Sequence, residues 1–368
     1  MQKKFNVTVV GGGNMGAALA ADISQRHDVS LLTNHPERWT KDFVSIDTEN
    51  GNTIRAHLKE ISSHPEDVIP KAEVVVITLP AFCREQAILR IEPYLKSEAL
   101  ICFMPGTGGV EFYVEKLLQR GTSVVGFDRV THVARIFECG KSVYVAKKKK
   151  VRFGTLGCRL ANIEEIIQSV FAIDADRLSN YLSVTFTPSN PILHTSRLFD
   201  LWLGKSSSFL FEKNPLFYAE WTDLASQILL GCDDELQAIC SKIDSFNLLP
   251  KIETIFLREH YESRNTTELT KKLTSIASLS QIKSPMIKVS NGYLMDKNSR
   301  YFKEDFPYGL QILIAFAEKF GIETPYMNKV NFWFKSECCL DFNQKSFPVR
   351  TIEEKSQESL LRFYAKWQ

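Results

Sequence analysis

Three glycines near the N-terminus have a spacing that could hold a nucleotide. The segment from Phe5 to Ala20 has the pattern of an apolar strand, a glycine-rich turn and an Ala-rich helix. In that context Gly11 permits the tight turn, Gly13 lets the backbone approach a pyrophosphate, and Gly16 lets the helix pack on the strand. The phosphates would then face free N–H groups at the helix N-terminus. A glycine-rich turn without a ligand is the alternative. The residues expected to contact a dinucleotide here are Gly11, Gly13, Asn14, Met15 and Gly16.

The end of the next predicted strand bears on the choice between NAD and NADP. An acidic residue at this place would hold the ribose 2′-hydroxyl of NAD. The sequence instead continues Thr33-Asn-His-Pro-Glu-Arg38, with no carboxylate at the strand end. Asn34 can donate a hydrogen bond to a 2′-phosphate, and Arg38 can reach it with a charged fork. We therefore expect a preference for NADP. The alternative is that Arg38 is a solvated residue and that Glu37 serves NAD.

Two polar motifs stand out in the second half of the chain. In Thr187-Pro-Ser-Asn-Pro-Ile-Leu-His-Thr195, Asn190 and His194 are four residues apart, so they share one face at the start of a helix. A lone histidine is more often structural. The second motif, from Ser299 to Gly309, contains Arg300 and Asp305. Its plain interpretation is a helix start with Asp305 as N-cap and Arg300 as a surface charge. Spacing alone favours the plain interpretation at both motifs.

The elements that would position these residues fall into two groups. Apolar runs alternate with helical segments up to about residue 183, which predicts an N-terminal doubly wound α/β domain of the Rossmann type with a parallel sheet. Pro80 ends one of these strands, at the sheet edge where ligands bind. Two β-like runs between Ser142 and Thr155 flank a lysine-rich turn and predict a hairpin. Beyond residue 183 helical periodicity dominates and predicts an all-α domain over 184–368. Its expected helices cover residues 217–228, 234–244, 267–277, 310–320 and 326–335.

Composition excludes several other classes of protein. The chain has 368 residues, 44% of them hydrophobic, and a formal net charge of +2, which argues against nucleic acid or a membrane surface as the main partner. No apolar run approaches the roughly 20 residues of a membrane span. The N-terminus lacks the features of a signal peptide, so a cytoplasmic location is expected. None of the eight cysteines forms a C-x-x-C pair, so free thiols and no metal site are expected.

Taken together, these motifs resemble those of the octopine/nopaline (opine) dehydrogenase family. The resemblance depends on the dinucleotide motif followed by N-P-x-x-H-T at 190–195, R-Y-x-x-E-D-x-P-Y-G-L at 300–310 and T-P at 324–325. It covers most of the chain and is weak between residues 200 and 290. It implies an enzyme that joins an amino acid or amine to a small, pyruvate-like 2-oxo acid and reduces the resulting imine with NAD(P)H.

The resemblance also implies roles for individual residues. The family's catalytic histidine falls on His194, its carboxylate partner on Asp305 and its asparagine on Asn190. Arg300 falls on a substrate-binding arginine, and Arg135 is a further candidate to face the substrate. These residue types suit the chemistry, since histidine transfers protons near neutral pH and arginine binds a carboxylate bidentately.

Two other functions remain open at this stage. A hydroxy-acid or sugar-phosphate dehydrogenase of similar architecture would often depend on a lysine, for which Lys205 is available. A non-enzymatic NADP-binding regulator would tolerate the loss of His194. The identity of the amine, the product stereochemistry and a possible homodimer are not determined by the sequence.

Overall fold

The computed structural model describes residues 3–338 and 345–368, which form two compact units. The first unit comprises Met1–Thr185 together with Phe363–Gln368, and the second comprises Phe186–Arg362. The sequence analysis placed the boundary after residue 183 and assigned the whole C-terminus to the second unit. The last residues belong to the first unit instead, because Phe363 stacks on Phe112 at 5.7 Å and Tyr364 hydrogen-bonds Glu111.

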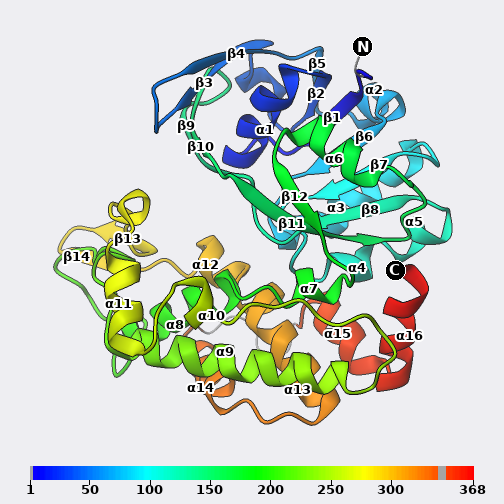
Figure 1. Ribbon diagram of the computed structural model, residues 1–368. Helices are drawn as coiled ribbons and strands as arrows, with labels where there is room; N and C mark the ends of the chain where they lie inside the picture. Colours follow the sequence, from blue (N-terminus) through cyan, green and yellow to red (C-terminus); the bar gives the residue numbers. More distant parts are fainter. Residues whose placement is uncertain (1–2, 339–344) are drawn as a thin grey trace. The chain divides into compact units, whose positions relative to one another are not determined.

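The first unit is built on an eight-stranded sheet (Figure 1) with the order β12-β11-β8-β7-β6-β1-β2-β5. The strands from β5 to β8 are parallel, and β11 pairs antiparallel with β8. The strand order reverses on either side of β1, as the predicted Rossmann-type fold requires. The strands are β1 (Asn6–Val10), β2 (Asp28–Leu32), β5 (Glu60–Ser62), β6 (Val74–Ile77), β7 (Leu100–Phe103), β8 (Ser123–Phe127), β11 (Lys150–Leu156) and β12 (Asp174–Arg177).

Helices cover this sheet on both sides, because right-handed crossovers in opposite directions from β1 place them on opposite faces. The helix α1 packs against α6, and α3 packs against α2 and α4. The central strands are buried along their whole length, which accounts for their continuous apolar sequences. The helices are α1 (Asn14–Ser24), α2 (Pro65–Val68), α3 (Ala81–Ile91), α4 (Val110–Tyr113), α5 (Glu115–Gln119), α6 (Ile163–Phe171) and α7 (Leu182–Thr185).

A second, four-stranded sheet in the first unit corrects the predicted hairpin. Its order is β4-β3-β10-β9, with β3 (Asp42–Asp47), β4 (Thr53–His57), β9 (His132–Glu138) and β10 (Ser142–Lys147). The two runs that flank the lysine turn do not pair with each other. Instead β10 pairs with β9 and β3, whereas β11 continues into the main sheet beside β8. The lysine-rich turn therefore connects β10 of the four-stranded sheet to β11 of the eight-stranded sheet.

The second unit is a helical bundle around the long helix α9, which contacts α8, α11, α13 and α14. The expected all-α domain is correct except for one small hairpin, β13 (Met286–Val289) with β14 (Gly292–Met295). The helices are α8 (Asn190–Trp202), α9 (Asp223–Asp244), α10 (Leu257–His260), α11 (Thr266–Thr274), α12 (Arg300–Lys303), α13 (Gln311–Phe320), α14 (Pro325–Cys338), α15 (Phe347–Glu354) and α16 (Gln357–Trp367), whose last residues lie in the first unit.

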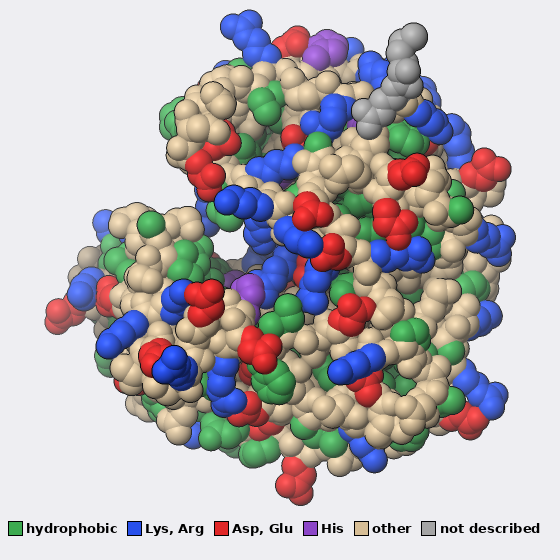
Figure 2. Space-filling model, viewed as in Figure 1, with side chains coloured by type: hydrophobic (Ala, Val, Ile, Leu, Met, Phe, Trp, Pro, Cys, Tyr) green, Lys and Arg blue, Asp and Glu red, His purple; other side chains and the backbone are tan. Residues whose placement is uncertain are grey.

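Basic and acidic side chains are interspersed over the face seen in Figure 2, in keeping with the small net charge. None of the described helices has the length and apolar character needed to cross a bilayer. The seven cysteines among the described residues are free thiols, and Cys339 lies outside the described residues.

Candidate active site in the helical unit

The histidine and the aspartate of the two polar motifs form a direct pair in the second unit. His194 Nδ1 lies 2.8 Å from Asp305 Oδ2, and each side chain is only 12% exposed. The two residues are 111 positions apart in sequence, so their pairing is a product of the fold. In this geometry the carboxylate accepts the Nδ1–H of the imidazole, which leaves Nε2 as the nitrogen that can accept or deliver a proton.

Close packing between α8 and the turn after α12 creates this pair. That turn, η5 (Phe306–Leu310), is a single π-helical turn, a feature found frequently at functional sites. Gly309 lies on η5 against Pro191, and a Cβ atom at Gly309 would come within 2.9 Å of the proline ring. The missing side chain lets the turn approach the start of α8. Asp305 occupies the position before η5, but its side chain makes no capping bond and turns to His194.

A third residue, Tyr218, completes a hydrogen-bonded chain. Its hydroxyl lies 2.9 Å from His194 Nε2, and the Tyr218 residue is 6% exposed. The tyrosine ring stacks on Trp221 at an interplanar angle of 11°. Because Nδ1–H donates to Asp305, Nε2 accepts the proton of the Tyr218 hydroxyl. The site is thus a linear Asp–His–Tyr chain.

The sequence analysis placed Tyr218 in a helix over 217–228 and gave it no role. The structure corrects this prediction, because residues 217–220 form a turn after the isolated bridge of Leu216 with Lys283, and α9 begins at Asp223. Thr222 caps that helix, since its side chain accepts the N–H of Ala225. The pair Thr222-Asp223, an N-cap followed by an acidic first turn, is the sequence signal that could have placed the helix start correctly.

Burial shifts the pKa values of Asp305 and Tyr218 in the Asp–His–Tyr chain. Removal from water raises the pKa of the Asp305 carboxyl above its ordinary value, while the neighbouring His194 opposes this change. Burial also raises the pKa of Tyr218 well above its ordinary value, so that its hydroxyl stays a neutral donor. The rings of Phe217 and Tyr301 lie 5.5 and 4.6 Å from the imidazole and exclude water from it. Such a dry site strengthens the bonds along the chain.

The other two candidates of this unit lie near the pair but make no direct bond to it among the described hydrogen bonds. Asn190 is exposed at the first position of α8, one helical turn before His194. Arg300 is 65% exposed and pairs with Glu304, with its Nε 2.7 Å from the carboxylate. A substrate carboxylate would have to share this guanidinium with Glu304.

The glycine turn of the first unit fits the pyrophosphate of a dinucleotide. Gly11 has a φ of +113°, a conformation that side chains rarely allow. A Cβ at Gly16 would lie only 1.8 Å from the carbonyl oxygen of Gly11, so the strand and α1 require glycine there. A Cβ at Gly13 would meet nothing within 4 Å, so the cradle is open at the N-cap of α1. Gly11 and Gly16 have the close backbone packing that the predicted motif requires, and contact of Gly13 with a pyrophosphate stays a prediction.

The remaining candidates of the first unit have varied surroundings. The Asn14 side chain is used internally, since its Oδ1 accepts the N–H of Ile136 on β9 at 2.9 Å. Met15 packs partly buried against the core of the unit. Pro80 stands immediately before α3 as its N-cap. Arg135 is exposed on β9 opposite Tyr144.

The end of β2 opens onto a cavity of about 440 Å³. Asn34 lines this cavity as expected, but Arg38 is not among its lining residues. Arg38 ends the short helix η1 (Pro36–Arg38) and is exposed. The lining arginine is Arg90, which comes from α3 and which the sequence analysis did not consider.

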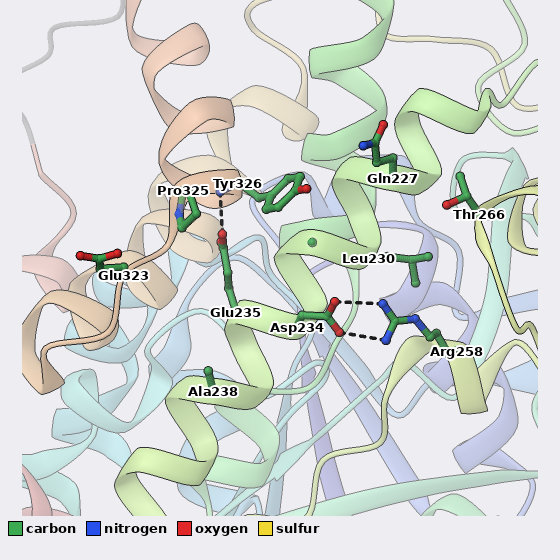
Figure 3. A pocket seen from close by; sticks show the side chains of 11 residues that line it. Gln227, Leu230, Asp234, Glu235, Ala238, Arg258, Thr266, Glu323, Pro325 and Tyr326 are labelled. Carbon is green, nitrogen blue, oxygen red and sulfur yellow. Dashed lines mark hydrogen bonds and ion pairs between the residues drawn. The ribbon is translucent and has the colours of Figure 1, made fainter.

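A second cavity, of about 520 Å³, lies between α9 and the start of α14 (Figure 3). Three of its charged side chains, Asp234, Glu235 and Arg258, already have partners. Asp234 accepts two bonds from Arg258 at 3.1 and 2.9 Å, and Glu235 accepts the N–H groups of Tyr326 and Met327 at 2.6 and 2.9 Å. Glu235 thereby holds the N-terminus of α14 against α9, which gives this cavity a structural role.

Comparison with known proteins relates both units to one group of enzymes. The family model "NAD/NADP octopine/nopaline dehydrogenase, alpha-helical domain" matches residues 177–337, and the model "Ketopantoate reductase PanE/ApbA" matches residues 7–157. An opine dehydrogenase of Haliotis discus hannai is 26% identical, over 92% of this chain and 91% of that relative. A tauropine dehydrogenase of Arabella iricolor is 25% identical, over 89% and 90% of the two chains.

The solved structures agree on the fold. An octopine dehydrogenase with NADH and L-arginine superposes with a TM-score of 0.82 at 23% identity, over 96% of this chain and 97% of that one. The glycine cradle and the helical unit first define a class, the two-unit oxidoreductases that use a nicotinamide dinucleotide. Within this class, residues 177–337 match the helical-domain model of the octopine/nopaline dehydrogenase family, and most of the chain is similar to opine and tauropine dehydrogenases.

Proposed function

We propose that this protein is an opine dehydrogenase, which condenses an amino acid or amine with a small 2-oxo acid and reduces the imine. The observation that supports this best is the buried chain from Asp305 through His194 to Tyr218. It provides a proton-transfer group of the kind that imine formation needs, in the unit that matches the family's helical domain. A bound NAD(P)H supplies the hydride.

His194 handles the protons of the condensation. Attack of the amine nitrogen on the 2-oxo carbon gives a carbinolamine, and loss of water from it requires a proton at the departing oxygen. The imidazolium of His194 delivers that proton from Nε2, and Asp305 stabilises the charged ring through Nδ1–H. Tyr218 holds Nε2 in its acceptor form between turnovers.

Arg300 and Asn190 bind and orient the substrates in this proposal. The exposed guanidinium of Arg300 binds the carboxylate of the 2-oxo acid bidentately, through two N–H groups, in place of Glu304. Asn190, one turn before His194 on α8, orients the substrate carbonyl. Solved relatives were obtained with L-arginine, pyruvate and agmatine, which are an amino acid, a 2-oxo acid and an amine. We assign the same classes of substrate to this chain.

The two alternative functions have weaker support. Glycerol-3-phosphate dehydrogenase and 2-dehydropantoate 2-reductase relatives match only 26% and 33% of the chain. Lys205, the lysine that a hydroxy-acid enzyme would use, donates to the carbonyl of Leu201 at the end of α8. A non-enzymatic regulator would have no need for the buried Asp305–His194 pair.

The test is an initial-rate assay of NADPH and NADH oxidation with pyruvate and 2-oxoglutarate, each with and without a panel of amino acids and amines. Oxidation that requires both substrates supports the proposal. Oxidation with the 2-oxo acid alone would indicate a hydroxy-acid dehydrogenase instead. Tight cofactor binding with no oxidation under any combination would support the regulator.

A further inference from the structure

The cavity at the end of β2 has an unusual distribution of charge. Among its lining residues, all of which are described, only Arg90 is formally charged at neutral pH, and no carboxylate is present. Gly11 and Gly12 of the dinucleotide turn form one wall, and Asn34 and His35 form another. The cavity therefore begins at the pyrophosphate cradle and extends to the strand end, where the adenosine ribose lies in this fold.

Hydrogen bonds fix the position of the Arg90 side chain. One terminal nitrogen donates to Asn34 Oδ1 at 3.1 Å and the other to the carbonyl of Ser63 at 2.9 Å. A guanidinium has five N–H groups, so these two bonds leave further donors available for a ligand. Arg90 thus places a positive charge beside the residue that would be acidic in an NAD-specific site.

We propose that Arg90 is the residue that selects NADP, by binding the 2′-phosphate of the adenosine ribose together with Asn34. The proposal rests on the proposed function, in that it concerns the cofactor of that reaction. A phosphate offers acceptors that match the planar fork of arginine, whereas a 2′-hydroxyl offers no charge to pair with it. The bond to Asn34 holds the fork in place before the ligand arrives, which reduces the entropy lost on binding.

Arg38 is the competing candidate on the neighbouring loop. Both arginines are exposed, but Arg38 lies on η1, outside the lining of the cavity. Next to it, Glu37 contacts His35 at 3.2 Å, so this loop brings a carboxylate toward any phosphate. Assigning the 2′-phosphate to Arg90 or to Arg38 therefore predicts opposite effects of replacing each arginine.

The experiment measures binding of adenosine 2′,5′-bisphosphate and adenosine 5′-monophosphate to the full chain by isothermal titration calorimetry, with no substrate present. These nucleotides differ only in the 2′-phosphate. Arg90→Gln is expected to weaken the bisphosphate about 10- to 100-fold and to leave the monophosphate within about twofold. Arg38→Gln serves as the matched comparison and is expected to change neither affinity. Asn34→Asp, at an exposed position, is expected to reverse the preference because its carboxylate repels the phosphate and pairs with Arg90.

Several results would overturn the inference. These are equal affinity of the wild type for the two nucleotides, unchanged affinities in Arg90→Gln, or weaker binding of the bisphosphate in Arg38→Gln alone. Failure to bind either nucleotide would overturn the inference and the proposed function together. Binding as expected, combined with no cofactor oxidation by any pair of substrates, would support the inference and overturn only the proposed function.

Discussion

Replacing Asp305 by asparagine removes one charge from the Asp–His–Tyr chain and almost no volume. The carboxylate bonds His194 at 2.8 Å in a site where both side chains are 12% exposed, so solvent screens the interaction little. A hydrogen bond to a charged group is worth about 1.5–3 kcal/mol, and each 1.36 kcal/mol is tenfold in rate, so kcat is expected to fall about 10- to 150-fold. The amide can also turn its N–H toward Nδ1 and so reverse the tautomer of His194, which adds to the loss.

The assay is steady-state oxidation of the reduced cofactor with saturating amine and 2-oxo acid, together with the KM of each substrate. Because the carboxylate acts through His194 and not on substrate, kcat should fall while both KM values stay within about twofold. The control is Asp234→Asn, which breaks an ion pair with Arg258 in the same unit, away from the chain, and should leave kcat unchanged. A kcat of Asp305→Asn within twofold of the wild type, in a folded protein, would refute this reasoning.

Three further predictions follow from the same contacts. Tyr218→Phe removes the donor to His194 Nε2 and should lower kcat about 2- to 10-fold; an unchanged kcat would exclude Tyr218 from the Asp–His–Tyr hydrogen-bonded chain. Arg300→Gln should raise the KM for the 2-oxo acid about 10- to 100-fold with little change in kcat, whereas a surface charge paired with Glu304 would leave that KM unchanged. Burial raises the pKa of the Asp233 carboxyl to about 6, so between about pH 4 and 6 the folded state holds a proton that the unfolded state has released. The folded state therefore loses about 3 kcal/mol of stability at most as pH rises from about 4 through 6. Asp233→Asn should abolish that part of the pH dependence in urea unfolding, and equal slopes for the two proteins would contradict the assignment.

The first unit was largely predictable, because its signals are local in sequence. The strands β1, β6 and β7 are largely apolar and each is followed by a helix, and Gly11 and Gly13 lie in the turn before α1 while Gly16 lies in its first turn. The failure at Ser142–Leu156 has a physical cause. Two β-like runs separated by a short polar turn fit a hairpin equally well as two strands in different sheets, and only pairing with the distant strands β3 and β8 decides between them.

The candidate active site was predictable in its residue types but not in its geometry. His194 and Asp305 could be singled out because each lies in a motif that the family resemblance makes informative. Their contact depends on Gly309 lying against Pro191, which no periodicity reveals. Tyr218 was missed as a partner because aromatic spacing suggested a helix, whereas residues 217–220 form a turn.

The proposed site for the 2′-phosphate shows the same limit. A sequence motif directs attention to residues adjacent to β2, and Arg38 is the nearest cation in the chain. The cavity places Arg90 of α3 beside Asn34 instead, 56 positions away in sequence. Packing of α3 against the end of β2 is a tertiary feature that a linear pattern does not record.

The central claim is that hydride reaches a carbon that bears nitrogen, and one labelling experiment tests it directly. The wild-type protein would be incubated with reduced cofactor that carries deuterium at the transferable position, an amine and a 2-oxo acid, and the products analysed by mass spectrometry and NMR. The account predicts that the wild-type product carries deuterium on the carbon next to the new secondary amine. It predicts that His194→Ala forms little or none of this labelled product. Deuterium in a 2-hydroxy acid, with no secondary amine formed, would contradict it.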